Sequence, residues 1–139
     1  MKIKGLVPWY GAKRSLAPQI VRQLGTHSVY WEPYCGSCAV LFAMPRCTHE
    51  TVNDLHQDLI NLTLVLQGEC SALELYARVS RCLFHEDLLP IAKTFLLDQQ
   101  LEPGVPNLER AYWYLVFSWM SLNGISGTPL QHKGTFAAR

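Results

Sequence analysis

Val29-Tyr30-Trp31-Glu32-Pro33-Tyr34-Cys35-Gly36-Ser37-Cys38-Ala39-Val40 carries the clearest structural signal in this chain. It predicts a strand, a tight turn and a helix in direct succession. The strand covers residues 29–31 and ends at Glu32, and a turn of small residues containing Gly36 leads into the apolar run 39–43. Glycine at such a turn lets a ligand approach the backbone, and a helix N-terminus can receive polar groups. We therefore expect a ligand site where this strand ends.

A second short strand is predicted from Glu50 to Leu55, and its C-terminal end carries Asp54. Ligands of open α/β sheets lie outside the carboxyl ends of the strands, and an acidic residue after the second strand suits a ribose with two hydroxyls. Each segment also has an ordinary interpretation, because Gly36 could be a simple turn residue and Asp54 a helix cap. Together they favour a ligand that contains a nucleoside.

Four segments carry more specific information. They are Pro8-Trp9-Tyr10-Gly11-Ala12-Lys13, Glu32-Pro33-Tyr34-Cys35-Gly36-Ser37, Asn53-Asp54-Leu55-His56-Gln57-Asp58-Leu59-Ile60-Asn61-Leu62, and the stretch 110–128. In this order and spacing they resemble the N-terminal half of the adenine-specific DNA methyltransferase family that includes the Dam-type enzymes. The last segment resembles the part that precedes the target-recognition region in phage-type members. The resemblance covers nearly the whole chain.

The resemblance implies an α/β fold that is a partial class I methyltransferase (Rossmann-like) domain, an N-terminal half with few strands and several helices. Residues 1–139 would be the part that binds S-adenosyl-L-methionine, with the catalytic-motif half absent. The implied cofactor-binding residues are Trp9, Lys13, Glu32, Tyr34, Gly36 and Asp54. Lys13 would lie near the methionine carboxylate, Glu32 and the Gly36 turn beneath the methionine and ribose, and Asp54 at the ribose hydroxyls. The charges agree, because a point cation suits a carboxylate and a carboxylate accepts strongly from hydroxyls.

The family's catalytic motif is an Asp, Asn or Ser followed by two prolines and an aromatic residue. It holds the flipped adenine and directs its amino nitrogen at the methyl group. None of the eight prolines of this chain adjoins another. We therefore expect a truncated cofactor-binding part of a site-specific DNA adenine methyltransferase, inactive by itself, with no catalytic residue assigned.

The complete enzyme would act on double-stranded DNA, in a restriction-modification or phage setting, and a second polypeptide could carry the catalytic half. The alternative is a catalytically silent remnant that binds S-adenosylmethionine or associates with DNA. A small redox protein that uses Cys35 and Cys38 is the interpretation that the sequence favours least.

The composition is that of a globular protein, with 49% hydrophobic and 17% charged residues and a net charge of +1. The charges before Glu32 are all basic, which suits either phosphate or an ordinary solvated surface. No stretch is apolar enough to span a bilayer, the five cysteines are an odd number, and the five histidines show no metal-ligand spacing. We expect a cytoplasmic protein, encoded by a bacterium or a phage, with no bound metal and no membrane contact.

The rest of the chain predicts scaffold helices. They are a helix capped by Ser15 that ends before Gly25, one over 59–66, one that begins with a capping box at Ser71 and Glu74, one over 88–97, and one from Asn107 to Leu122, followed by a loop from Asn123. The aromatic residues of the last helix are expected to be mostly core. Two strands make a poor sheet, because an edge would keep unpaired backbone groups. We expect the isolated chain to be marginally stable or to self-associate.

Overall fold

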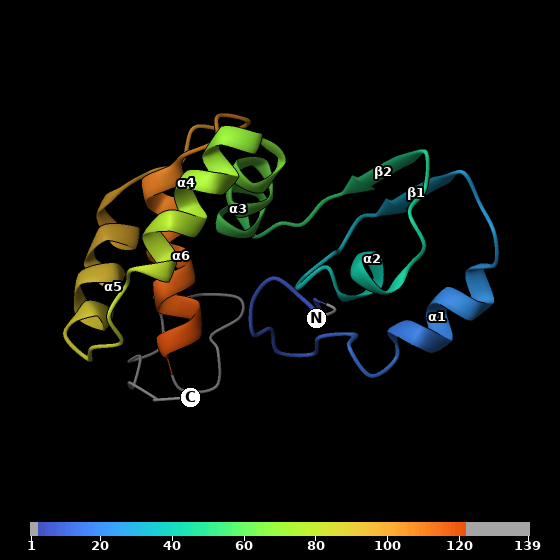
Figure 1. Ribbon diagram of the computed structural model, residues 1–139, viewed down its shortest axis with the longest axis horizontal. Helices are drawn as coiled ribbons and strands as arrows, with labels where there is room; N and C mark the ends of the chain where they lie inside the picture. The colour runs from blue at the N-terminus through green and yellow to red at the C-terminus, as the bar shows by residue number, and fades with distance from the viewer. Residues whose placement is uncertain (1–2, 122–139) are drawn as a thin grey trace. The chain divides into compact units, whose positions relative to one another are not determined.

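The computed structural model describes residues 3–121, and the chain divides into two compact units, one up to Leu55 and one from His56 (Figure 1). Each unit is described separately. In the described part the elements are α1 (Ala17–Leu24), β1 (Val29–Glu32), α2 (Ala39–Ala43), β2 (His49–Val52), α3 (Gln57–Gln67), α4 (Glu69–Ser80), α5 (Leu88–Asp98) and α6 (Leu108–Met120). The described residues therefore form several helices and one small sheet, which is compatible with part of a methyltransferase domain.

The first unit is built on β1 and β2, which pair in parallel with Val29 opposite His49 and Glu32 opposite Val52. The expected first strand is confirmed. The second strand begins one residue before the expected Glu50 and ends at Val52, but the pairing continues beyond it, because Asn53 N–H donates to the Glu32 carbonyl at 2.9 Å. Asp54 thus follows the strand instead of ending it.

Alternation along β1 places Tyr30 and Glu32 on a buried face and leaves Val29 and Trp31 exposed on the other. Tyr30 packs in the core of this unit with Ala17 of α1 and Val40 of α2. The two helices therefore cover the face that carries Tyr30 (Figure 1).

The expected Ser15 cap of the first helix is wrong. Leu16 occupies the N-cap position with helical dihedral angles, no side chain caps the helix, and a proline lies in its first turn. A backbone carbonyl takes the role expected of the Ser15 hydroxyl. Ala17 N–H donates to the Lys13 carbonyl at 2.7 Å, so one of the amide donors at the start of α1 has its partner without a side-chain cap.

The second unit is helical in its described part, and α6 packs against α3, α4 and α5. Its fully buried side chains include Leu59, Leu62, Val65, Leu96, Tyr114 and Phe117. The expectation for the aromatic residues of α6 is confirmed for Tyr114 and Phe117, whereas Trp119 is 42% exposed. The loop expected from Asn123 lies outside the described residues.

Two polar contacts tie α3 to α6. The buried Arg110 guanidinium forms an ion pair with Asp58 and also donates to the Gln99 carbonyl. Asn61 Nδ2 donates to the Asn107 carbonyl at 2.9 Å, and Asn107 N–H donates to Asn61 Oδ1 at 2.7 Å. Buried polar groups are costly when unpaired, so these pairs set how the two helices meet.

The expected capping box at Ser71 and Glu74 is also wrong. Helix α4 begins at Glu69 with Gly68 as its N-cap, so Ser71 already lies in the first turn. Its hydroxyl donates to the Val65 carbonyl at 2.6 Å, a backbone group at the end of the preceding helix. Because that carbonyl needs a donor, Ser71 joins two helices instead of starting one.

Candidate cofactor-binding site

The turn after β1 has a conformation that depends on glycine. Cys38 N–H donates to the Cys35 carbonyl at 2.9 Å and closes the turn, and Gly36 has a φ of 49°. A Cβ on Gly36 would lie 2.9 Å from Trp9 Nε1, which is closer than a Cβ atom comes to a non-bonded atom in proteins. The indole of Trp9 therefore rests on the bare backbone of Gly36, at the turn where the sequence predicts the close approach of a ligand.

Asp54 reaches the same turn from the other strand. Gly36 N–H donates to Asp54 Oδ2 at 2.8 Å, and Cys35 N–H donates to the Asn53 carbonyl at 3.0 Å. The Asp54 carboxylate is partly buried. At the carboxyl ends of β1 and β2, the Gly36 N–H thus meets the Asp54 carboxylate. The sequence predicts that the Gly36 turn and Asp54 lie together at this edge of the sheet.

Lys13 and Glu32 form an ion pair, with Lys13 Nζ 2.9 Å from Glu32 Oε1. The ammonium also donates to the Tyr34 carbonyl at 2.8 Å. The Lys13 side chain is 37% exposed, whereas Glu32 is buried. A cation is therefore held at the mouth of the turn by one buried carboxylate and one backbone oxygen.

Tyr34 contributes its backbone, since its side chain is 69% exposed and only its carbonyl takes part in these contacts. The six predicted residues consequently fall into two linked groups in the first unit. Trp9, Gly36 and Asp54 form one, and Lys13, Glu32 and Tyr34 form the other. Residues 34–36 are consecutive and join the two groups.

Tyr30 is a supporting residue that sequence reasoning missed. Its hydroxyl donates to Glu32 Oε2 at 2.9 Å in a buried hydrogen bond. Burial, followed by this hydrogen bond, raises the pKa of Tyr30 above its usual range, so the phenol keeps its proton and remains a donor. The signal was present, because residues two apart on a strand share a face.

The segment before α1 is also anchored to the turn. Leu6 N–H donates to the Ser37 carbonyl at 2.9 Å, and the Arg14 guanidinium donates to the Val7 carbonyl at 2.7 Å. Val7 is fully buried. These contacts place the segment that carries Trp9 and Lys13 against the end of β1.

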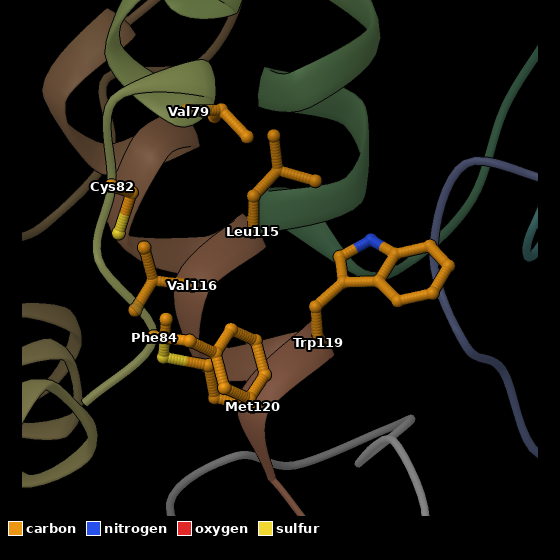
Figure 2. Close-up of a pocket in the computed structure, with 7 residues that line it drawn as sticks. All are labelled: Val79, Cys82, Phe84, Leu115, Val116, Trp119 and Met120. Carbon is orange, nitrogen blue, oxygen red and sulfur yellow. The ribbon is translucent and has the colours of Figure 1, made fainter. Parts of the chain in front are cut away.

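A separate pocket of about 260 Å³ lies in the second unit (Figure 2). It is lined by Val79, Cys82, Phe84, Leu115, Val116, Trp119 and Met120. Its lining has no charged side chain to meet a carboxylate or a ribose, so we do not count it as a nucleoside site. Among residues 3–121, no three His, Cys, Asp or Glu side chains are grouped closely enough to hold a metal ion. In the same range, no helix has the length and apolar character needed to cross a bilayer.

Comparison with known proteins adds two findings. The chain is 32% identical over 74 residues to the retron Ec67 DNA adenine methylase of Escherichia coli. That match includes 53% of this chain and 26% of the relative, so it spans about a quarter of the relative's length. The profile of the D12 class N6 adenine-specific DNA methyltransferases matches residues 9–125, which contain the four segments singled out in the sequence apart from their outermost residues. The chain therefore belongs to the D12 class N6 adenine-specific DNA methyltransferase family.

Proposed function

We propose that this chain is the S-adenosylmethionine-binding part of a DNA adenine N6-methyltransferase, with the partial class I (Rossmann-like) fold of such a domain. The observation that carries the proposal is the 2.8 Å hydrogen bond between Gly36 N–H and Asp54, which joins the ends of two parallel strands in a member of this family. This is the place at which open α/β sheets bind nucleotide-like ligands.

The residues at this place suit the chemistry of the cofactor. A carboxylate has about four lone-pair sites, so accepting from the Gly36 N–H is compatible with the acceptance of hydrogen bonds from ribose hydroxyls that we propose for Asp54. Trp9 over Gly36 offers an aromatic face beside bare backbone. Lys13 is the cation for the methionine carboxylate, and Glu32 holds it in position. Tyr34 supplies the carbonyl that orients the same ammonium.

The proposed reaction is the direct transfer of a methyl group to the amino nitrogen of adenine in double-stranded DNA. When bound, S-adenosylmethionine supplies that methyl group from a sulfonium. The residues described here bind and orient, and none of them is proposed to act on the adenine. No two prolines are adjacent in these 139 residues. We therefore propose that the catalytic motif lies outside them, for example on a second polypeptide.

Calorimetric titration with S-adenosylmethionine tests the binding proposal. Asp54→Ala is expected to weaken saturable binding by about tenfold or more, which corresponds to about 1.4 kcal/mol. Asp87→Ala is the matched control, because it removes an equal charge from an exposed position in the other unit. Equal affinity of the Asp54 variant, or no binding by a chain whose helices are intact by circular dichroism, would contradict the proposal.

Methyl incorporation into duplex DNA distinguishes the proposed part-enzyme from a complete one. With labelled S-adenosylmethionine and no added polypeptide, we expect no incorporation above background, because the adenine-holding motif is not among these residues. Methylated adenine made by this chain alone would show that another segment does its work. A catalytically silent remnant differs from this only in having no catalytic partner. A segment of the Asp-Pro-Pro-Tyr type encoded beyond Arg139 would favour the part-enzyme, and the lack of one would favour the remnant.

A further inference from the structure

Cys35 and Cys38 stand at the two ends of the turn after β1, and the proposed function gives neither thiol a role. Both side chains are 1% exposed. The hydrogen bond from Cys38 N–H to the Cys35 carbonyl closes the four-residue turn at 2.9 Å. A closed turn brings its end Cα atoms within about 7 Å, and a disulfide spans Cα separations of about 4.4 to 6.8 Å. The turn therefore keeps the two Cα atoms within or close to the range that a disulfide spans.

The two thiols also interact with each other in an unequal way. A hydrogen bond from the Cys38 thiol is the main influence on Cys35 and lowers the pKa of Cys35. The same hydrogen bond, followed by burial, raises the pKa of Cys38. One sulfur of the pair is thus more easily ionised while the other keeps its proton, which is the arrangement of an attacking thiol and a resolving thiol.

The other three cysteines provide no equivalent arrangement in the described residues. Cys47, Cys70 and Cys82 are all free thiols, and none of them shares a closed turn with another cysteine. The sulfurs of Cys47 and Cys82 lie near neighbouring backbone carbonyls, at 3.8 and 3.6 Å, as the Cys38 sulfur lies 3.9 Å from the Gly36 carbonyl, so the closed turn is what distinguishes Cys35 and Cys38. The pairing is therefore specific to the turn after β1.

We propose that Cys35 and Cys38 form a dithiol–disulfide site, oxidised by small-molecule disulfides. Because both thiols are buried, the exchange takes place when the turn opens locally. The Cys35 thiolate then attacks one sulfur of the oxidant, the oxidant's S–S bond breaks, and a mixed disulfide forms. Cys38 then loses its proton, its sulfur attacks Cys35, and the second oxidant sulfur leaves. The protein is oxidised by two electrons, the oxidant becomes two thiols, and these carry the two protons. The site needs no bound cofactor and goes beyond the proposed methyltransferase function.

The test uses the unmodified chain in mixtures of oxidised and reduced dithiothreitol. After quenching in acid and alkylating the free thiols, trypsin releases residues 23–46 as one peptide, which contains Cys35 and Cys38 and no other cysteine. The disulfide form of this peptide is two hydrogen atoms lighter than the dithiol and carries no alkyl groups. Its fraction at each ratio of the two reagents gives an equilibrium constant.

We expect this constant to be larger in native buffer than in guanidinium by about tenfold or more, because the fold holds together two sulfurs that the unfolded chain leaves apart. Cys70→Ser, at an exposed position, should leave the constant unchanged, and Cys38→Ser should abolish the disulfide peptide. Equal constants in the two solvents would overturn the proposal, as would two alkylated thiols at every ratio. Since no S-adenosylmethionine is present, these outcomes are independent of whether the cofactor proposal holds.

Discussion

Replacing Gly36 with alanine perturbs the turn at the point where β1, β2 and Trp9 meet. The φ of 49° is in the left-handed region, which costs a residue with a Cβ about 1 to 2 kcal/mol. The new methyl would also lie 2.9 Å from Trp9 Nε1 and 3.1 Å from Trp9 Cδ1, and overpacking of this kind costs about 1 to 3 kcal/mol. Alanine also lowers the conformational entropy of the unfolded chain, which offsets about 0.4 to 1 kcal/mol of this loss. The expected loss of stability is about 3 kcal/mol, within a range of about 1 to 5 kcal/mol.

Gly11→Ala is the matched control, because it separates the backbone cost from the contact with Trp9. Gly11 has a φ of 69°, but a Cβ there would meet nothing within 4 Å. It belongs to the same unit and should lose only about 1 kcal/mol, the backbone cost less the restriction of the unfolded chain. In a Trp9→Ala background, Gly36→Ala should cost about as little as Gly11→Ala does in the unmodified chain.

Native-state hydrogen exchange suits this comparison, because the two compact units need not unfold together. The amides that pair β1 with β2 report the opening free energy of the first unit. Titration with S-adenosylmethionine of the same variants should show weaker binding for Gly36→Ala than for Gly11→Ala. Equal opening free energies for the two variants would refute the reasoning that Trp9 rests on Gly36.

Three further predictions concern the scaffold and the buried phenol. Asp58→Ala should lower the free energy of unfolding by about 3 to 5 kcal/mol in urea denaturation, because it leaves the Arg110 charge buried and unpaired, and adding Arg110→Met should recover part of that loss. Asn107→Ala should cost about 1 kcal/mol and lower Tm, since Asn107 Oδ1 caps α6 by accepting from Arg110 N–H at 2.9 Å; an unchanged Tm would mean that water replaces the cap. Tyr30 has its pKa raised by burial and by Glu32, so the folded chain keeps a proton that the unfolded chain loses above about pH 10, and stability should fall as the pH rises through this range. Tyr30→Phe should flatten that alkaline loss in a pH series of urea midpoints, and an identical slope in both chains would refute the cause.

The strand, turn and helix around Gly36 could be predicted from the sequence because their causes are local. A β-prone run, a glycine and an apolar run act within about fifteen residues, and the structure has β1 and α2 where they were expected. The meeting of Gly36 with Asp54 was also predictable, because the carboxyl ends of neighbouring parallel strands share one edge. The family followed from motifs of the same kind.

The expected caps at Ser15 and Ser71 were wrong for a shared physical reason. A hydroxyl near the start of a helix competes with every donor and acceptor within its reach. The Lys13 carbonyl accepts a hydrogen bond from the first amide of α1, that of Ala17, and the Val65 carbonyl of α3 accepts one from the Ser71 hydroxyl of α4. The capping-box pattern considers four consecutive residues, and neither of these carbonyls lies within the four residues that it considers.

Local patterns in the amino-acid sequence are thus enough to predict the family, the order of strand, turn and helix, and the residue types that meet at the end of β1. Which polar groups satisfy one another at a distance depends on the tertiary packing. Lys13 turns to Glu32 and the Tyr34 carbonyl, and Arg110 reaches back 52 residues to Asp58. Burial makes an unpaired charge or donor costly, and the partner that relieves this cost is set by the packing of whole elements, which local patterns do not contain.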